Sequence, residues 1–457
     1  MAHSTAERGQ WGSRIGFILA AAGSAIGLGN IWRFPYMAGE NGGGAFVLLY
    51  LLCVLLIGLP VLLAELAIGR RTERNPVGAF KALAPKSMWP LLGGLGVVTG
   101  FGILSFYSVV AGWTIGYLFK ASTGAFAVDL TAEASGALFT DLIGDPLQAM
   151  LLTALFLLLT ILVVRGGVSG GIERASKILM PLLLTILVLL AVRALTLPGA
   201  GAGLAYLFKP DFSKLDTGVV ISALGQALFS LSLGMGAMIT YGSYFPKREN
   251  MWSAGTFVAF SDTIVATLAG LIIFPALFSA GVAPNAGPGL VFVVLPTIFD
   301  TMPFGTFFAV AFYALLSIAA LTSTISLMEV VVSYFVDERG WSRERSAWTI
   351  GAACFALAVP SALSQGAVPL LGADGLFAWD FLTLNNNIWG NYSLSLGALL
   401  VCVFVGWRWG VAPAVASLEE GGHRLPATGA WRVLIRYVCP IAVAIIFLFI
   451  VVTGQYF

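Results

Sequence analysis

Charged residues are scarce in this 457-residue chain. Asp, Glu, Lys and Arg make up 10% of it, whereas a typical soluble domain contains about 25%. Hydrophobic residues make up 58%. A chain this apolar cannot cover a surface that faces water, so we expect lipid to be its solvent. The net charge of +2 is too small to favour nucleic acid as a partner.

Patterns that bind metals or nucleotides are also missing. The two histidines, His3 and His423, stand far apart in polar segments, and we interpret them as solvated. The cysteines lie inside apolar runs without the spacing of metal ligands, so we expect them to pack as small apolar side chains. They are Cys53, Cys354, Cys402 and Cys439. The sequence has no phosphate-binding loop, His-Glu-x-x-His motif or nucleophile elbow. We therefore predict neither an enzyme nor transport driven directly by ATP.

Long apolar stretches are what the chain has instead. A helix needs about 20 mostly apolar residues to cross a bilayer, and eleven stretches meet that condition. The chain is therefore predicted to be an all-α integral membrane protein. The predicted spans are 14–37, 43–70, 88–119, 147–165, 174–197, 218–244, 252–281, 304–336, 343–363, 376–409 and 431–455. The Pro- and Gly-rich stretch 284–303 is predicted to be a folded external loop with room for a short helix.

The basic residues predict the orientation. Most Lys and Arg residues fall on the side of the N-terminal segment 1–13, and the opposite side holds Lys120, Arg193, Lys209 and Lys214. Basic loops stay in the cytoplasm. We therefore expect a cytoplasmic N-terminus and an external C-terminus. The short termini favour a bacterial inner membrane.

Two of the predicted spans are interrupted. Gly23–Asn30 breaks span 14–37, and Ser230–Gly236 breaks span 218–244. The two broken spans lie five spans apart. Because successive spans cross the membrane in alternating directions and five is an odd number, the two five-span halves, 14–197 and 218–409, have opposite topology. A last segment, 431–457, follows them. Interrupted helices at corresponding positions of two inverted halves indicate a transporter's binding site.

The interruptions have a physical cost that a ligand can offset. Glycine is less favourable than alanine in a helix by about 1 kcal/mol, and each unpaired backbone group in lipid costs several kcal/mol. Carbonyls at the end of a half-helix suit a cation, and amides at the start of the next suit a carboxylate. The alternative is a packing face of small residues. The polar residues beside the glycines in both spans favour a binding site.

Ionisable residues inside spans are functional candidates, because they are expensive in lipid. They are Arg33, Glu65, Asp262, Glu329 and Asp380. Arg33 and Asp380 lie near the outer ends of their spans, where they form either a gate or a static ion pair. Glu65 is predicted to cap amides of an unwound neighbour, and Glu329 has no assigned role.

Three consecutive hydroxyls, Thr322, Ser323 and Thr324, lie deep in span 304–336. Such hydroxyls usually bond back to their own helix. Three in a row also suit a hard cation such as sodium, which prefers oxygen ligands.

At these residues the chain resembles a known family. Gly23–Tyr36, followed by Glu40–Phe46, is similar to the opening of the neurotransmitter:sodium symporter family. Supporting matches are Gly58–Arg70, Ser230–Gly236 with Thr240 and Tyr241, and Leu321–Ser323. The resemblance runs from about Arg8 to the last span and is strongest to the bacterial eleven-span branch of amino acid transporters. It implies two inverted five-helix repeats with broken helices 1 and 6. This family is itself the standard example of the broken-helix rule, so the two arguments are not independent.

The resemblance implies two sodium ions and a substrate pocket. The first ion would bind the Ala25 carbonyl, Asn30, Ser230, Asp262 and the substrate carboxylate. The second would bind the Gly23, Ile26 and Ala319 carbonyls with the Thr322 and Ser323 hydroxyls. The pocket would be lined by Gly27, Ile103, Tyr107, Phe229, Ser232, Met235, Ser323 and Leu327, with Tyr107 donating to the substrate carboxylate. Arg33 and Asp380 would form the outer gate, and Arg8 and Asp337 the inner gate, with Trp11 nearby.

Two positions refine the expected function. Amine transporters of the family carry aspartate at the position of Gly27, so glycine there implies an amino acid substrate. Asp262 stands where the family usually has asparagine, and the glutamate that replaces chloride in some bacterial members aligns with Ala266. We hypothesise that Asp262 supplies the charge that chloride supplies elsewhere.

We therefore expect a symporter of neutral, hydrophobic L-amino acids that works by alternating access, is coupled to two sodium ions and is independent of chloride. The alternatives are proton coupling through Asp262 or Glu329, and a non-transporting substrate receptor on the same scaffold.

Overall fold

The computed structural model describes residues 9–126, 130–284, 287–376 and 379–454. Within those ranges the chain is helical and contains no strand. Nine helices there are long and apolar enough to cross a membrane without interruption. The predicted all-α membrane architecture is therefore confirmed.

Several of the uninterrupted spans contain a π turn (labelled η) in which the helix widens by one residue. Five of these spans are single α-helices: α6 (Pro90–Ser122), α8 (Pro146–Val164), α13 (Met251–Ser279), α15 (Gly305–Arg339) and α16 (Arg343–Leu363). The other four combine α-helices with π turns. They are α3 (Gly44–Cys53) with η2 (Val54–Gly58) and α4 (Leu59–Thr72); η3 (Val168–Glu173) with α9 (Arg174–Leu195); α17 (Phe381–Asn385) with η7 (Asn386–Ser393), α18 (Leu394–Val403) and η8 (Phe404–Arg408); and α20 (Thr428–Val433) with η9 (Leu434–Val438) and α21 (Cys439–Thr453). The span predicted at 174–197 begins earlier, at Val168, because η3 carries the chain past Gly170 and Gly171.

The two predicted interruptions are present. The first separates α1 (Arg14–Ala25) from η1 (Gly29–Arg33) and α2 (Phe34–Glu40), and the two parts are bent by 47°. The second separates α11 (Thr217–Ser230) from α12 (Ala237–Ser243). Counted with the bent first pair, the described residues form ten candidate spans by length and composition. The second break leaves α11 as a shorter apolar helix, so the eleventh predicted span stays a prediction.

Backbone conformation ends α11 in the middle of the bundle. Ser232, Gly234 and Gly236 have φ values of +54°, +79° and +77°. An α-helix of L-residues cannot continue through such conformations, and Ser232 adopts one at a cost that glycine would not have. The break therefore follows from the sequence at these positions.

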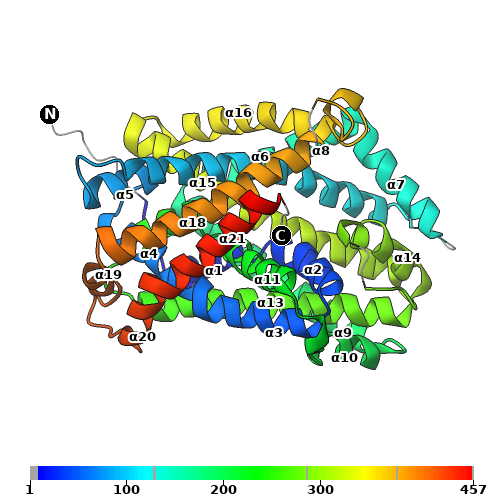
Figure 1. Ribbon diagram of the computed structural model, residues 1–457. Coiled ribbons are helices and arrows are strands. Elements are labelled where there is room, and N and C mark those ends of the chain that lie inside the picture. Colours follow the sequence, from blue (N-terminus) through cyan, green and yellow to red (C-terminus); the bar gives the residue numbers. More distant parts are fainter. Residues whose placement is uncertain (1–8, 127–129, 285–286, 377–378, 455–457) are drawn as a thin grey trace.

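Short helices cover the two ends of the bundle, which lies on its side in Figure 1. At the left are α5 (Pro76–Leu83) and α19 (Val411–Leu418). At the right are α7 (Ala132–Gly144), α10 (Ala200–Phe208) and α14 (Val294–Thr301). The described start of the chain, residues 9–13, also lies at the left. We call this the basic end, because the predicted topology assigns most Lys and Arg residues to it, and we call the opposite one the far end. The short 3₁₀ helices η4 (Phe212–Lys214), η5 (Gly287–Leu290) and η6 (Pro369–Leu371), which share the label η, complete the connections.

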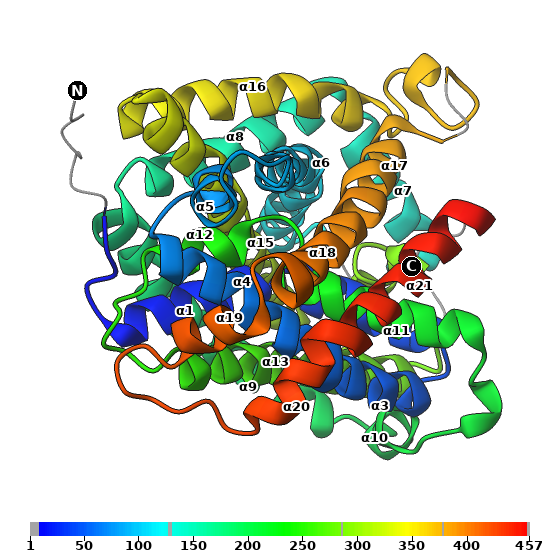
Figure 2. The ribbon, with the colours of Figure 1, turned by 60° about the vertical axis from the view of Figure 1, so that its left-hand side comes forward.

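The corresponding third spans of the two halves, α6 and α15, pack along each other in the interior. Figures 1 and 2 show α16 along one side of the bundle and α3 and α10 along the opposite side. The broken spans therefore lie between these outer helices.

Helices α4 and α12 touch through their backbones. A Cβ atom built on Gly242 would lie 2.7 Å from the Leu66 carbonyl oxygen, and one on Gly69 would meet the Ile239 carbonyl. Small residues permit such close approach in membrane proteins. The inner half of the second broken span is thereby fixed against span 44–72.

We predict that Gly242→Ala lowers the stability of the protein, because overpacking of this kind costs about 1–3 kcal/mol. The matched control is Gly94→Ala on α6, where nothing lies within 4 Å of the added Cβ. Thermal unfolding of both variants in detergent measures the difference. A Gly242→Ala protein that melts at or above the temperature of Gly94→Ala contradicts the close contact.

Candidate functional site

The two helix breaks meet around one small chamber. Its volume is about 30 Å³. All eight residues that the resemblance assigned to the substrate pocket line it: Gly27, Ile103, Tyr107, Phe229, Ser232, Met235, Ser323 and Leu327. Ser24, Ala25, Gly29, Ser230 and Ser326 also belong to its wall. The structure thus brings together residues from four spans.

Polar side chains hold the unwound backbone around this chamber. The Leu28 amide donates to the Tyr107 hydroxyl over 2.9 Å, and the Gly27 amide donates to Asn30 Oδ1 over 3.0 Å. On the other break, the Gly234 amide donates to Glu65 Oε1 over 2.7 Å. Glu65 therefore caps an unwound neighbour, as the sequence predicted.

Asp262 lies at the centre of the first predicted ion site. Its Oδ1 accepts from Asn30 Nδ2 over 2.7 Å and from the Ser230 hydroxyl over 2.8 Å. Its Oδ2 accepts from the Tyr50 hydroxyl over 2.9 Å. Asn30, Ser230 and Asp262 thus meet as predicted. Tyr50 was not among the predicted residues.

The charge of this site favours a cation. Asp262 is fully buried, and among the described residues no Lys or Arg forms an ion pair with it. A buried carboxylate without a basic partner is costly. The carboxylate, hydroxyl and amide oxygens around it are ligands of the kind that hard cations such as sodium prefer.

A second group of oxygens joins α1 to α15. The Thr322 hydroxyl lies 2.9 Å from the Ala319 carbonyl oxygen and 3.4 Å from that of Ile26. The Ser323 hydroxyl lies 3.4 Å from the Ser24 carbonyl oxygen. Thr324 instead pairs with Thr160 on α8, 2.8 Å away. Two of the three consecutive hydroxyls therefore face the first break.

Helix α1 approaches α15 closely at this second group of oxygens. A Cβ atom on Gly23 would lie 3.2 Å from Thr322 Cβ. Glycine at this position lets the carbonyls at the end of α1 reach the hydroxyls of α15. The donor set of this group is again oxygen only, so it fits sodium and not a softer metal.

A larger cavity of about 310 Å³ opens from the chamber toward the far end. The two share Gly29, Tyr107 and Phe229 in their walls. The guanidinium of Arg33 lies 4.7 Å from the centre of the Phe229 ring and donates to Gln226 Oε1 over 3.0 Å. The Phe229 ring and Arg33 therefore stand at the boundary between the cavity and the chamber.

The second predicted gate residue, Asp380, begins α17. Its carboxylate accepts from Gln365 Nε2 over 2.7 Å and from the Thr383 hydroxyl over 2.7 Å. Gln365 and Thr383 line the same cavity as Arg33. Arg33 thus lines this cavity, and Asp380 is bonded to two of its lining residues, so each member of the predicted outer gate has polar neighbours of its own.

Aromatic packing closes the basic end. Trp11 is buried, donates to the Tyr241 carbonyl over 3.2 Å, and contacts the rings of Tyr241 and Tyr244 edge-on. Arg8 lies outside the described residues. Its predicted partner Asp337 accepts from the backbone and side-chain amides of Asn75 over 3.0 and 3.1 Å.

Two buried carboxylates strengthen this closure. Glu329, which had no predicted role, accepts from the Tyr244 hydroxyl over 2.7 Å and pairs with Arg343. The carboxylate of Glu173 accepts from the Gly12 amide over 2.6 Å and from the Ser13 hydroxyl over 2.8 Å. These contacts join residues 12 and 13 to η3, and the end of α12 to α15 and α16.

Comparison with known proteins agrees with this geometry. The family model described as the sodium:neurotransmitter symporter family matches residues 8–134 and 140–456. A sodium-dependent transporter of Bacillus subtilis, YhdH, is 42% identical over 440 residues, which cover 96% of this chain and 97% of the relative. A sodium-dependent transporter of Haemophilus influenzae is 35% identical over 98% of this chain and 99% of its own length. The crystal structure of MhsT in complex with L-phenylalanine superimposes with a TM-score of 0.89 at 47% identity, covering 96% of this chain and 99% of that one.

We predict that Asp262→Asn weakens sodium binding. A unit charge about 4 Å from the ion contributes on the order of 4 kcal/mol at an effective dielectric constant of about 20. The measurement is the rise in melting temperature that sodium gluconate causes, since a bound ion stabilises the folded state. The exposed Asp374→Asn is the control. Equal stabilisation of both variants by sodium would remove Asp262 from the ion site.

Proposed function

The chain belongs to the sodium:neurotransmitter symporter family and is a sodium-dependent transporter. From this premise we propose that it carries a neutral, hydrophobic L-amino acid together with two sodium ions. The observation that supports this most is the single chamber between the two helix breaks, where apolar walls meet both groups of oxygen ligands.

The chamber's wall favours this substrate class. A Cβ atom on Gly27 would lie 2.9 Å from the Tyr107 hydroxyl and would also meet Ser323, so an acidic side chain for pairing with an amine has no room there. The Tyr107 hydroxyl, which accepts from the Leu28 amide, would donate its proton to the substrate carboxylate. Ile103, Met235 and Leu327 provide apolar contact for a side chain. MhsT, the 47% identical neighbour, was crystallised with L-phenylalanine.

Sodium would act through contacts that join separate parts of the bundle. An ion at the second site binds the Ile26 carbonyl of the first break and Thr322 of α15, so it favours the state in which these elements are together. That is the state with the basic end closed. Sodium binding thereby becomes coupled to the conformation of the transporter.

The energy of two ions is sufficient. One charge that crosses 100 mV releases about 2.3 kcal/mol, and a tenfold concentration ratio adds about 1.4 kcal/mol. Two ions provide roughly 7 kcal/mol, which sustains a substrate gradient on the order of 10⁵-fold. A single ion would sustain about the square root of that gradient.

Alternating access follows from the two closures. The halves 14–197 and 218–409 would move so that the far-end cavity and the basic end open in turn. Arg33 with Asp380 would gate the first, and Arg8 with Asp337 the second. We place the protein in a bacterial inner membrane, with the basic end and the N-terminus in the cytoplasm.

Proton coupling through Asp262 or Glu329 is the alternative, and the contacts of Glu329 argue against its part in it. Glu329 forms an ion pair with Arg343 and accepts a hydrogen bond from the Tyr244 hydroxyl, so its carboxylate already takes part in a contact that closes the basic end. Asp262 remains the position through which protons could act. Removal of sodium at constant pH separates the two forms of coupling.

We predict that proteoliposomes accumulate labelled hydrophobic L-amino acids under an inward sodium gradient and not under an equal potassium gradient. Asn30→Ala abolishes the accumulation, because it removes the side chain that joins Gly27 to Asp262. Asp374→Asn, at an exposed position, is the control. Sodium-independent uptake, or no uptake of any amino acid tested, would reject the proposed coupling.

We also predict that replacing chloride by gluconate leaves uptake unchanged, because the buried charge of Asp262 stands beside the first ion. In Asp262→Asn that charge is missing, so the remaining uptake becomes stimulated by chloride. Uptake by the unmodified protein that requires chloride would disprove the role of Asp262.

A further inference from the structure

Arg70 carries a buried charge, and the proposed transport cycle assigns no role to it. It lies at the basic end of α4 and is among the largest fully buried side chains, with 0% of its side chain exposed. Burying a guanidinium costs several kcal/mol unless hydrogen bonds and a counter-charge compensate. Its surroundings therefore decide how stable the closed basic end is.

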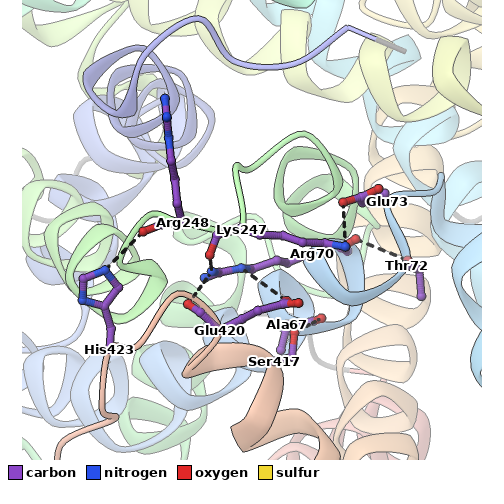
Figure 3. A network of polar contacts seen from close by, with 10 residues as sticks. Ala67, Arg70, Thr72, Glu73, Lys247, Arg248, Ser417, Glu420 and His423 are labelled. Carbon is purple, nitrogen blue, oxygen red and sulfur yellow. Dashed lines mark hydrogen bonds and ion pairs between the residues drawn. The ribbon is translucent and has the colours of Figure 1, made fainter. Parts of the chain in front are cut away.

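Figure 3 shows Arg70 between two loops that are far apart in sequence. We call residues 244–250 the 6–7 loop and residues 409–427 the 10–11 loop. Arg70 Nη2 donates to the Lys247 carbonyl of the 6–7 loop and, over 2.7 Å, to the Glu420 carbonyl of the 10–11 loop. One buried side chain thus holds both loops.

Compensation of the buried charge is incomplete. Arg70 Nε lies 3.9 Å from Glu420 Oε2, and Nε and Nη1 donate to no acceptor among the described residues. The guanidinium also faces the Phe245 ring at 5.5 Å, and Phe245 packs on Phe17 of α1 at 4.3 Å. The closed state therefore bears a desolvation cost that a water-exposed Arg70 would not have.

The 10–11 loop fits closely over this site. The Ser417 hydroxyl donates to the Ala67 carbonyl over 3.0 Å, and the His423 ring lies 3.3 Å from the Arg248 carbonyl oxygen. Gly421 has φ +90°, and a Cβ atom on it would lie 2.7 Å from the Lys247 carbonyl oxygen and 3.0 Å from that of Arg248. The loop backbone is thus in direct contact with the 6–7 loop.

We propose that Arg70 and the 10–11 loop form a clamp that holds the 6–7 loop in place while the basic end is closed. The proposal rests on the proposed function. The 6–7 loop follows α12 and begins with Tyr244, which joins Glu329 of α15. Separation of α12 from α15 would carry this loop, together with α4 and Arg70, away from the 10–11 loop, because α4 and α12 contact each other through their backbones. Opening of the basic end therefore requires release of the contacts that Arg70 and the 6–7 loop make with Glu420 and Gly421, and Arg70 is a positioning residue for that step.

Adjacent glycines provide a matched test. Gly422 has φ +84°, similar to Gly421, but nothing lies within 4 Å of its added Cβ. Gly422→Ala therefore introduces the same backbone strain without the clash. Only Gly421→Ala displaces the 10–11 loop from the Lys247 carbonyl.

The measurement is hydrogen–deuterium exchange of the full-length protein in detergent over a range of sodium chloride concentrations. Peptides that cover residues 9–20 and 244–250 report opening of the basic end. Sodium should suppress their exchange in the unmodified protein. We expect Gly421→Ala to raise the sodium concentration for half-suppression about tenfold, the change that 1.4 kcal/mol produces. Gly422→Ala should leave it unchanged.

A second pair of variants guards against poor folding of Gly421→Ala. Glu420→Gln removes the counter-charge of Arg70, so it should shift the same sodium midpoint in the same direction. Glu73→Gln breaks only the half-exposed pair with Lys247, and such surface pairs contribute little. It should not shift the midpoint.

Three results would overturn the clamp. In the first, Gly421→Ala and Gly422→Ala have the same sodium concentration for half-suppression of exchange, and Glu420→Gln has the value of the unmodified protein. Another is a uniform rise in exchange across all spans, which indicates general destabilisation. In the third, exchange of the peptides that cover residues 9–20 and 244–250 rises, and sodium does not suppress it. Failure of the proposed function is distinct, because the unmodified protein would then show neither sodium-dependent exchange nor uptake.

Discussion

A bilayer supplies no hydrogen-bond partners to a broken helix, and the centre of this protein is organised by that constraint. Each break exposes amides and carbonyls in the middle of the bundle. Side chains satisfy these amides: Tyr107 of α6 accepts from Leu28, Glu65 of α4 accepts from Gly234, and Asn30, in the same broken span, accepts from Gly27. The carbonyls face hydroxyls and the chamber. The structural requirement of the breaks and the chemical requirement of an ion site are therefore met by the same residues.

Charge is distributed according to the same constraint. Asp262 is buried with hydrogen-bond donors and no basic partner among the described residues, whereas Glu329 is buried with Arg343. The first arrangement leaves a charge for a mobile cation to neutralise. The second is neutral as a pair and joins α15 to α16. Two carboxylates at similar depth of burial are thus suited to cation binding in one case and to closure in the other.

Much of this arrangement could be predicted from the sequence, because glycine clusters and ionisable residues stand out in an apolar chain. The positions of the spans, both breaks and the capping role of Glu65 were predictable in this way. Tyr50 and Gln226 were not, since a tyrosine or glutamine in a span has no local signal of its partner. Their contacts with Asp262 and Arg33 depend on packing between distant spans. The contacts of Glu329 and Glu173 likewise depend on how loops fold at the basic end.

The backbone contact between α4 and α12 has a mechanical consequence. Without a layer of side chains between them, the two helices cannot slide by changing rotamers, so a displacement of α12 is transmitted to span 44–72. That span is a rod of 29 residues, about 44 Å long at about 1.5 Å per residue. A tilt of about 5° around one end moves the other end by about 4 Å at that length. Span 44–72 is therefore a lever arm, through which a small rotation at one surface of the membrane becomes a displacement of atomic size at the other.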